Sequence, residues 1–287
     1  MPSGVISSAR HDFHVALRSR LLTRDTEGIP SNADKKNKGS VTIANGIIDR
    51  LGGCKTARKL AGQTAGAEFE EKCAEFVKEC FGALEHMRPG EWFVGRGQGP
   101  DNLDISNYDQ YSHLAALATL AKDSVPLATA LGNDYLIKPD VVVTRSPEPD
   151  ESFNATDLVV DSDSATYTSL RKVNQERRIL HASISCKWTM RSDRAQNSRS
   201  EGLNLVRNRK GRLPHISVIT AEPTPSRIAS IAMGTGDIDC VYHFALYELL
   251  DTVAADENLS DSLDLLNVMI DGKRLRDVSD LPIDLIV

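Results

Sequence analysis

Four charged residues in the middle of the chain could together cleave a phosphodiester bond. Asp140 follows Pro139 inside an apolar stretch, where a carboxylate must be paired, protonated or bound to a metal ion. Lys187 ends a polar stripe, and Glu70 and Glu201 lie on predicted helices that can reach the same cleft. Carboxylate oxygens suit Mg²⁺, and a lysine can steady a water molecule or the charge that grows on a phosphate. Taken alone, Asp140 is equally well explained as a turn cap and Lys187 as an edge lysine.

A compact group of alternating charges, Arg191-Ser192-Asp193-Arg194, follows Lys187 closely. In the major groove of DNA, guanine offers the O6 and N7 acceptors, which suit a bidentate arginine, and cytosine offers the N4 donor, which suits an aspartate. Arg191 and Arg194 could therefore read two guanines while Asp193 spans two cytosines. Without Asp140 and Lys187 upstream, an Arg-Asp pair on a solvated helix would be the preferred explanation.

The spacing of apolar residues predicts the elements that position these side chains. A helix over 65–87 ends at Arg88-Pro89-Gly90 and carries Glu70 on its inward side. A β-branched stretch, 136–144, predicts the strand that holds Asp140. Residues 179–190 alternate, with apolar side chains on one face and a polar, half-exposed face that borders a cleft. The polar face consists of His181, Ser183, Ser185 and Lys187.

The remaining elements complete a mixed α/β core of about 65–255. They are a helix over about 193–208, a strand at 215–220, a strand near 239–244 and an amphipathic helix after it. We expect one domain over 1–287, in which a helical portion (about 1–60) precedes this core and an acidic segment (about 256–287) follows it. Gly95–Gly99 is interpreted as a turn, and His11 with His14 as part of a helix surface that binds no metal.

Charge is distributed unevenly along the 287 residues. The net charge of −6 excludes a uniformly basic nucleic-acid coat, yet residues 187–212 carry eight Lys and Arg against two acids. From residue 237 onward, twelve acids stand against three basic residues. A local basic surface on an acidic protein is compatible with nucleic-acid binding, because attraction to phosphates acts within roughly 8–10 Å.

The cysteines and the apolar stretches indicate a location. Five cysteines without a C-x-x-C pair fit neither a disulfide framework nor a zinc knuckle, so we expect a reducing cytoplasm. The start of the chain lacks an apolar export segment, and the most apolar stretches are far shorter than a membrane span.

The spacing of these motifs resembles a known nuclease core. Pro139-Asp140, Ser185-Cys186-Lys187, Arg191–Arg194 and Glu201 are similar to the PD-(D/E)XK core as rearranged in type II restriction endonucleases that cut at CCGG. The resemblance implies a restriction-endonuclease-like mixed β-sheet flanked by helices. Ser185 departs from the wider superfamily, which usually has an acid two residues before the lysine. In the resembling subgroup the following helix supplies that carboxylate, which assigns the role to Glu201.

The same resemblance implies roles for individual residues. Asp140 and the backbone carbonyl of Cys186 would bind the metal, Glu201 and Glu70 would support it, and Lys187 would lie near the attacking water. Two Mg²⁺ ions per active site are implied. Weaker similarity assigns the flanking base pair to Asp34, Lys36 and Arg227, and a minor-groove contact to Gln63.

The resemblance also implies a substrate and partners. The site would be a CCGG-containing palindrome, GCCGGC, in double-stranded DNA, cut to leave 5′ CCGG overhangs. A palindrome favours two-fold pairing of subunits, and relatives of this subgroup assemble two such dimers into a homotetramer. A protecting DNA methyltransferase would be a separate chain.

Two other classes of protein remain open. A sequence-specific DNA-binding regulator that has lost catalysis would keep the arginines but tolerate replacement of Lys187. A PD-(D/E)XK repair nuclease would not need Asp193 among its arginines.

Overall fold

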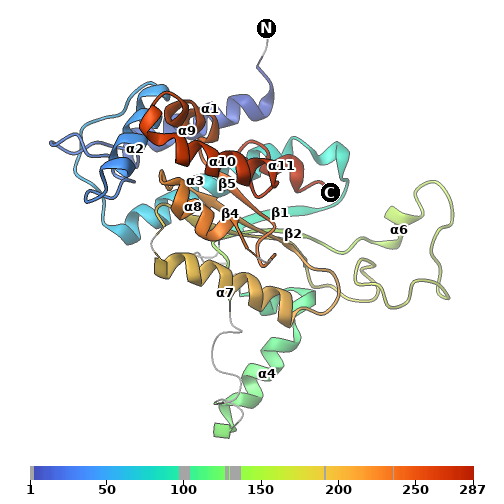
Figure 1. Ribbon diagram of the computed structural model, residues 1–287. Helices are drawn as coiled ribbons and strands as arrows, with labels where there is room; N and C mark the ends of the chain where they lie inside the picture. Colours follow the sequence, from blue (N-terminus) through green and yellow to red (C-terminus); the bar gives the residue numbers. More distant parts are fainter. Residues whose placement is uncertain (1–2, 97–103, 127–128, 130–136, 191, 235) are drawn as a thin grey trace.

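A six-stranded sheet forms the centre of the computed structural model (Figure 1). The structure describes residues 3–96, 104–126, 129, 137–190, 192–234 and 236–287, with the backbone alone for 192–196. The strands follow one another in the sheet in the order of the sequence. They are β1 (Trp92–Arg96), β2 (Val141–Arg145), β3 (Ile179–Lys187), β4 (His215–Thr220), β5 (Cys240–His243) and β6 (Leu275–Asp277).

The sheet is mixed, as the sequence predicts. The pairs β1-β2 and β2-β3 are antiparallel, whereas β3-β4, β4-β5 and β5-β6 are parallel. Parallel neighbours need crossover connections, and helices provide them: α7 (Ser192–Asn208) joins β3 to β4, and α8 (Pro225–Ala232) joins β4 to β5. The prediction of a mixed α/β sheet flanked by helices is confirmed.

Helices from distant parts of the sequence cover the sheet (Figure 1). The helix that carries Glu70, α3 (Gly62–Gly82), packs against β1, β2 and β3 and also against α1 (Val5–Arg20). The helix α2 (Lys38–Arg50) packs against α9 (Leu246–Ala254), and α10 (Ser260–Asp271) packs against α8. Shorter helices are α4 (His113–Lys122), α6 (Asp150–Phe153) and α11 (Leu281–Asp284). None of the helices in the described part of the chain is both long and apolar enough to cross a membrane.

Several element boundaries follow the prediction closely. The strand at 215–220 is confirmed, and the helix predicted at 193–208 is α7. The helix predicted over 65–87 is α3, but α3 ends at Gly82 and a separate 3-10 turn covers Glu85–Met87. The strand predicted over 136–144 begins later, at Val141, because Pro139 has no N–H to donate to a ladder. Residue 136 lies outside the described residues.

Two interpretations of glycine and histidine positions are wrong. Gly95 and Arg96 do not form a turn but end β1, paired with Val142 and Val141 of β2, while residues 97–99 lie outside the described part of the chain. His14 does not lie on a helix surface: it is buried, and its Nε2 lies 2.7 Å from the Phe244 carbonyl oxygen.

The sequence predicts that the whole polar face of β3 is half-exposed, but only two of its four residues are. Ser185 and Lys187 are partly exposed, but His181 and Ser183 are buried. The chain beyond α11 covers the end of β3 that carries His181, since the His181 Nε2 lies 2.6 Å from the Leu285 carbonyl oxygen. The cleft on β3 is thus confined to the end of the strand that carries the lysine.

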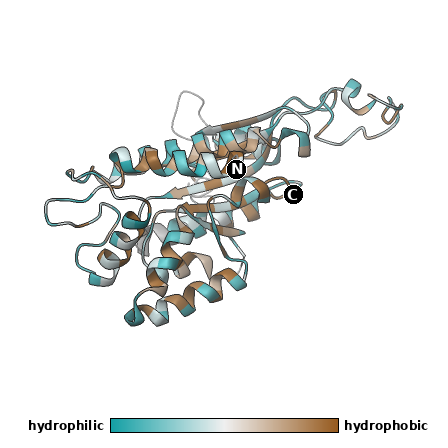
Figure 2. Ribbon diagram, turned by 90° about the horizontal axis from the view of Figure 1, so that it is seen from above, coloured by the Kyte–Doolittle hydropathy of each residue, from teal (hydrophilic) through white to brown (hydrophobic). Residues whose placement is uncertain are grey.

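A long segment between β2 and β3 projects from the body of the molecule (Figures 1 and 2). Its fold is held by Arg171, which donates to both carboxylate oxygens of Asp150 and to the Asp161 carbonyl. Large apolar side chains in this segment are exposed: Leu158 by 79%, Val159 by 62%, Tyr167 by 98% and Val173 by 72%.

Candidate active site

Asp140 lies at the centre of a polar cluster at the end of β3. Its Oδ2 accepts hydrogen bonds from the Lys187 Nζ at 3.0 Å and from the Cys186 N–H at 2.7 Å. The Ser185 hydroxyl lies 3.4 Å from the same oxygen and is also hydrogen-bonded to Glu201. Three consecutive residues of one strand therefore converge on one carboxylate that precedes the neighbouring strand.

The direction of the Cys186 carbonyl follows from the ladder. In an extended strand, the N–H and the C=O of one residue face the same neighbour, and successive residues face opposite neighbours. The Lys187 carbonyl faces the chain that continues β4, where it accepts from the Ala221 N–H at 3.1 Å. The Cys186 carbonyl therefore faces Asp140. The Cys186 side chain is buried on the apolar face of β3, as the alternation predicts.

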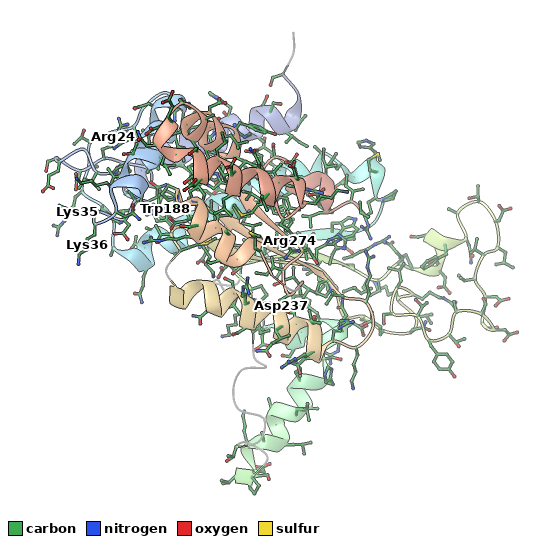
Figure 3. All side chains as sticks on the ribbon, viewed as in Figure 1. Arg24, Lys35, Lys36, Trp188, Asp237 and Arg274 are labelled. Carbon is green, nitrogen blue, oxygen red and sulfur yellow. The ribbon has the colours of Figure 1, made fainter. Side chains whose placement is uncertain are left out.

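Glu201 reaches the cluster from α7. Burial raises the pKa of its carboxyl, and the negative charge of Asp140 raises it further, whereas Lys187 opposes both effects. Gly202 fixes the position of this helix turn, because a Cβ there would lie only 2.4 Å from the Asp237 carbonyl oxygen. Asp237 is labelled beside α7 in Figure 3. A glycine inside a predicted helix lowers helix stability relative to alanine, so its position next to Glu201 is a signal that the sequence contains.

Glu70 completes the cluster from α3. Only 8% of its surface is exposed, and its Oε2 is buried without a hydrogen-bond partner. Burial, followed by the charge of Asp140, raises the pKa of Glu70 to about 7. Its neighbour Phe69 packs edge-on against Trp188, with ring centroids 5.3 Å apart, which fixes α3 against the end of β3. The helix turn that carries Glu70 is thus held at the lysine end of the strand.

Lys187 balances these carboxylates. Burial acts against its charged form, but attraction to Asp140 and Glu201 outweighs it and raises the pKa of the ammonium group. Lys187 therefore stays charged at neutral pH. The structure brings together all five residues that the sequence singled out for catalysis: Glu70, Asp140, Ser185, Lys187 and Glu201.

The donor set fits a hard divalent cation. Within the described ranges, no three His, Cys, Asp or Glu side chains converge closely enough to enclose an ion. Mg²⁺ does not require such a cage, since it commonly binds one or two carboxylates and keeps several waters. The unpartnered Oε2 of Glu70 and the inward-facing carbonyl of Cys186 beside Asp140 are oxygen atoms of the kind that such an ion prefers.

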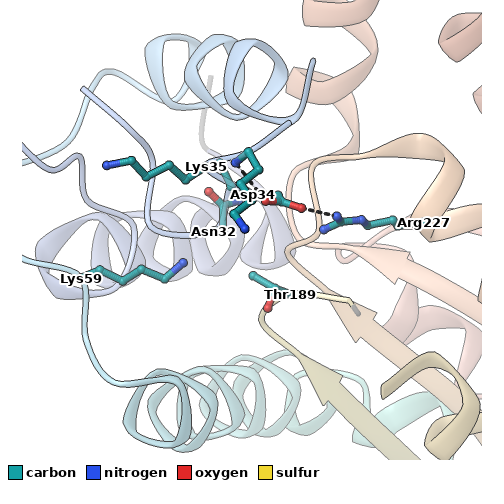
Figure 4. A pocket seen from close by; sticks show the side chains of 8 residues that line it. Asn32, Asp34, Lys35, Lys59, Thr189 and Arg227 are labelled. Carbon is teal, nitrogen blue, oxygen red and sulfur yellow. Dashed lines mark hydrogen bonds and ion pairs between the residues drawn. The ribbon is translucent and has the colours of Figure 1, made fainter. Parts of the chain in front are cut away.

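A cavity of about 550 Å³ adjoins this cluster (Figure 4). It is lined by Thr189, two residues after Lys187, and by a basic set of side chains around Asp34. Asp34 and Arg227 form an ion pair across it. The basic side chains that line the cavity are Lys35, Lys36, Lys59 and Arg227. Lys35 and Lys36 project on the same side of the molecule as Trp188 (Figure 3).

The other predicted DNA contacts have less defined positions. Arg191 lies outside the described residues, and Asp193 and Arg194 lie in the first turn of α7, where only the backbone is described. Gln63 is exposed near the start of α3, and Lys36 is exposed in the loop before α2. The backbone of Asp193 and Arg194 thus belongs to the same helix as Glu201, at its start.

The chain matches a protein family model described as "NgoMIV restriction enzyme" over residues 13–287. It belongs to the NgoMIV restriction enzyme family. The type II restriction enzyme NgoMIV of Neisseria gonorrhoeae is 54% identical to it over 284 residues, covering 99% of each chain. The chain is also similar to a solved complex of the restriction endonuclease PspGI with substrate DNA. That similarity has 14% identity and a TM-score of 0.27, and it covers 98% of this chain and 90% of the other.

Membership in the NgoMIV restriction enzyme family confirms the resemblance drawn from the motifs. The chain is a type II restriction endonuclease and so a site-specific deoxyribonuclease that acts on DNA. Enzymes of this family depend in general on a divalent metal ion. Family membership also argues against a regulator that has lost catalysis, and the chain retains the charged residues that the sequence singled out for catalysis: Glu70, Asp140, Lys187 and Glu201.

Proposed function

We propose that the chain hydrolyses double-stranded DNA at the palindrome GCCGGC with Mg²⁺ and leaves 5′ CCGG overhangs. The observation that carries this proposal is the convergence of Lys187, Cys186 and Ser185 on Asp140, with two further carboxylates beside them. This arrangement supports hydrolysis of a phosphodiester bond because it combines oxygen ligands for a cation with a fixed ammonium group.

The residues divide the chemistry between them. Asp140, the Cys186 carbonyl and Glu201 would hold Mg²⁺, two ions per active site, with support from Glu70. When bound, the metal would supply Lewis-acid polarisation of the phosphate and lower the pKa of a water molecule. Lys187 stays charged and would stabilise the negative charge that develops on the scissile phosphate. Ser185 holds Glu201 and takes the place of the usual acid.

We assign recognition of the DNA bases to two groups of residues. Arg191 and Arg194 would contact the two guanines of each CCGG half-site, and Asp193 the two cytosines. Asp34 and Arg227, which face each other in the cavity of Figure 4, would read the outer G·C pair. Their opposite charges match the cytosine donor and the guanine acceptors of that pair. Lys36 and Gln63 are proposed to contact the flanking pair and the minor groove.

We further propose a homotetramer built from two dimers. One Arg191–Arg194 group reads one half-site, so a palindrome requires two subunits. The exposed apolar side chains of the projecting segment support an additional contact between copies of the chain. We place the enzyme in the cytoplasm, beside a protecting methyltransferase on another chain. A measurement of mass in solution tests the oligomer: a monomer at assay concentration would contradict it.

The decisive test is digestion of a plasmid of known sequence with Mg²⁺ and with EDTA, followed by sequencing of the fragment ends. We expect discrete ends at GCCGGC with a four-base 5′ overhang, and only with metal. Scattered ends would favour a repair nuclease. Intact plasmid that is retarded on a gel would favour a DNA-binding regulator.

The reading group is tested by Asp193→Ala. Loss of the contact to cytosine N4 should lower discrimination against changed C·G pairs by about 1–3 kcal/mol per contact. The rates of cleavage of GCCGGC and of duplexes that differ at one inner pair measure this change. An unchanged preference would refute the assignment of Asp193.

A further inference from the structure

Glu222 is a buried carboxylate next to the site that the reaction itself does not use. It follows β4 and has none of its surface exposed. Its Oε2 accepts the Met190 N–H at 2.8 Å, and its Oε1 accepts the Thr224 N–H at 3.1 Å. Met190 directly precedes Arg191, so this bond fixes the backbone at the point where the chain enters the proposed base-reading group.

The same carboxylate faces the second group of proposed base readers. Its Oε2 lies 3.8 Å from Arg227 Nη1, while another nitrogen of Arg227 is paired with Asp34. The loop that carries Glu222 also holds the Asp34 segment directly, since the Ala221 carbonyl accepts from the Asn32 side-chain amide at 2.8 Å. One loop therefore contacts Met190, which precedes the first group of proposed base readers, and both Arg227 and the Asp34 segment of the second group.

This loop is also bonded to the catalytic strand. The Lys187 carbonyl accepts from the Ala221 N–H at 3.1 Å and from the Thr220 hydroxyl at 3.0 Å. The Glu222 N–H in turn donates to the Thr220 hydroxyl at 3.1 Å. A displacement of the loop would thus shift the backbone of Lys187 and the segments that carry both groups of proposed base readers.

Burial of a carboxylate at this position destabilises the fold, so its presence calls for an explanation. Burial raises the pKa of Glu222, although the hydrogen bond from the Met190 N–H opposes that effect. Arg227, the cation that faces it, is beyond hydrogen-bond distance, and a buried charge without close pairing destabilises a fold. If this side chain only capped the turn, it would have to accept only the Thr224 N–H. A neutral side chain could do that.

We infer that Glu222 is a positioning residue for sequence discrimination, which holds the inner-pair and outer-pair readers in one register relative to Lys187. This inference rests on the proposed function, because it assumes that Arg191–Arg194 and Asp34 with Arg227 read bases. Glu222 touches neither DNA nor metal in this account. It acts through the Met190 backbone and the Arg227 guanidinium.

Glu222→Gln tests the inference. A glutamine has one oxygen and one NH₂ group, so it cannot accept from Met190 and Thr224 together, and it loses the attraction to Arg227. We compare kcat/KM on duplexes that contain GCCGGC, the outer-pair variant ACCGGT and an inner-pair variant. The expected result is that the preference for GCCGGC over either variant falls by about tenfold.

Asp277→Asn is the matched control for loss of a buried carboxylate. Asp277 is fully buried and accepts from Arg10 and from the Leu246 N–H, away from the proposed base readers. This variant should lower the midpoint of thermal unfolding and leave the sequence preference unchanged. Equal loss of preference in both variants would overturn the inference, because general destabilisation would then explain it.

A milder variant keeps the test valid if Glu222→Gln does not fold. Asn32→Ala releases the same loop from the Asp34 segment without removing a charge, and it should lower the preference at the outer pair in the same direction. An unchanged preference in the variant that folds would overturn the role of the loop. If the wild-type enzyme did not cleave GCCGGC at all, the proposed function would fail instead.

Discussion

Two buried clusters of charge in this molecule have opposite character. At the outer end of the sheet, Arg10 of α1 donates to both oxygens of Asp277 and to both oxygens of Glu248. Although burial acts in the other direction, the bonds from Arg10 lower the pKa of both carboxyls. In the catalytic cluster the pKa values of Glu70 and Glu201 are raised instead.

The difference lies in how far the charges are satisfied. Arg10 has a bidentate partner on each side, so its cluster is complete within the fold. Lys187 stands against three carboxylates, and one oxygen of Glu70 has no partner. A complete cluster stabilises the fold, whereas an incomplete one keeps affinity for an external cation or phosphate. The following predictions test this distinction.

The largest effect is expected at Lys187. Lys187→Ala should lower the cleavage rate by roughly 10³-fold or more while specific DNA binding is retained, because the ammonium group is proposed to stabilise charge in the transition state. Cleavage of a GCCGGC duplex and a gel-shift assay without metal measure the two effects. Lys78→Ala, on the exposed side of α3, is the control and should cut normally. A Lys187→Ala enzyme with the wild-type rate would remove the proposed active site.

Arg10→Ala should have the opposite profile. It leaves the buried Asp277 and the partly buried Glu248 without their cationic partner, so the free energy of unfolding should fall by up to about 3–5 kcal/mol. The rate of cleavage per folded molecule should stay near that of the wild type. Denaturant titration and cleavage assays on the same preparation separate the two quantities. An Arg10→Ala protein as stable as the wild type would show that the cluster of Arg10, Asp277 and Glu248 does not stabilise the fold.

Gly202→Ala should weaken catalysis by displacing a helix without altering a charge. The added Cβ would meet the Asp237 carbonyl at 2.4 Å, so α7 must move and carry Glu201 with it, at a cost of about 1–3 kcal/mol. Cleavage rates at several Mg²⁺ concentrations should show a higher metal requirement. Gly66→Ala on α3 is the control, because nothing lies within 4 Å of its Cβ. Equal behaviour of the two variants would argue against a packing constraint on Glu201.

The smallest effect concerns pH and the metal-free protein. Glu70 keeps its proton up to about pH 7 in the folded state, whereas in the unfolded chain it loses the proton near pH 4.3. Between these values the folded state binds more protons, so its contribution to stability falls as the pH rises. The decrease should be on the order of 1–3 kcal/mol, and Glu70→Gln should remove it. Unfolding titrations at pH 5 and pH 8 in EDTA measure the difference.

The sequence contains most of the catalytic cluster but little of what surrounds it. Asp140 and Lys187 can be predicted because the apolar stretch around Asp140 and the alternation of β3 direct both to one cleft, whereas Glu201 is assigned through the resemblance to the nuclease subgroup. Glu222 is not predictable in the same way. Its role depends on the backbone N–H of Met190, 32 positions away, and no pattern of residue types records such a contact.

The limits of the fold prediction have a similar origin. His181 and Lys187 belong to one alternating stripe, and only the packing of the chain near Leu285 buries the first and leaves the second open. β1 lacks an alternating pattern, and its strand conformation depends on pairing with β2. The acidic segment gave no strand signal, yet Leu275–Asp277 pairs with β5 and extends the sheet.

The order of the strands has a consequence for how the molecule assembles. Each strand pairs with the next one along the chain, so the sheet can grow by adding one strand at a time without inserting any between two others. The bond between Arg10 and Asp277, however, joins residues 267 positions apart. That bond requires β6 to be in place, although α1 also packs against α3. Contacts at such separation slow folding, so the attachment of the first helix to the last strand opposes the fast assembly that the consecutive strand order allows.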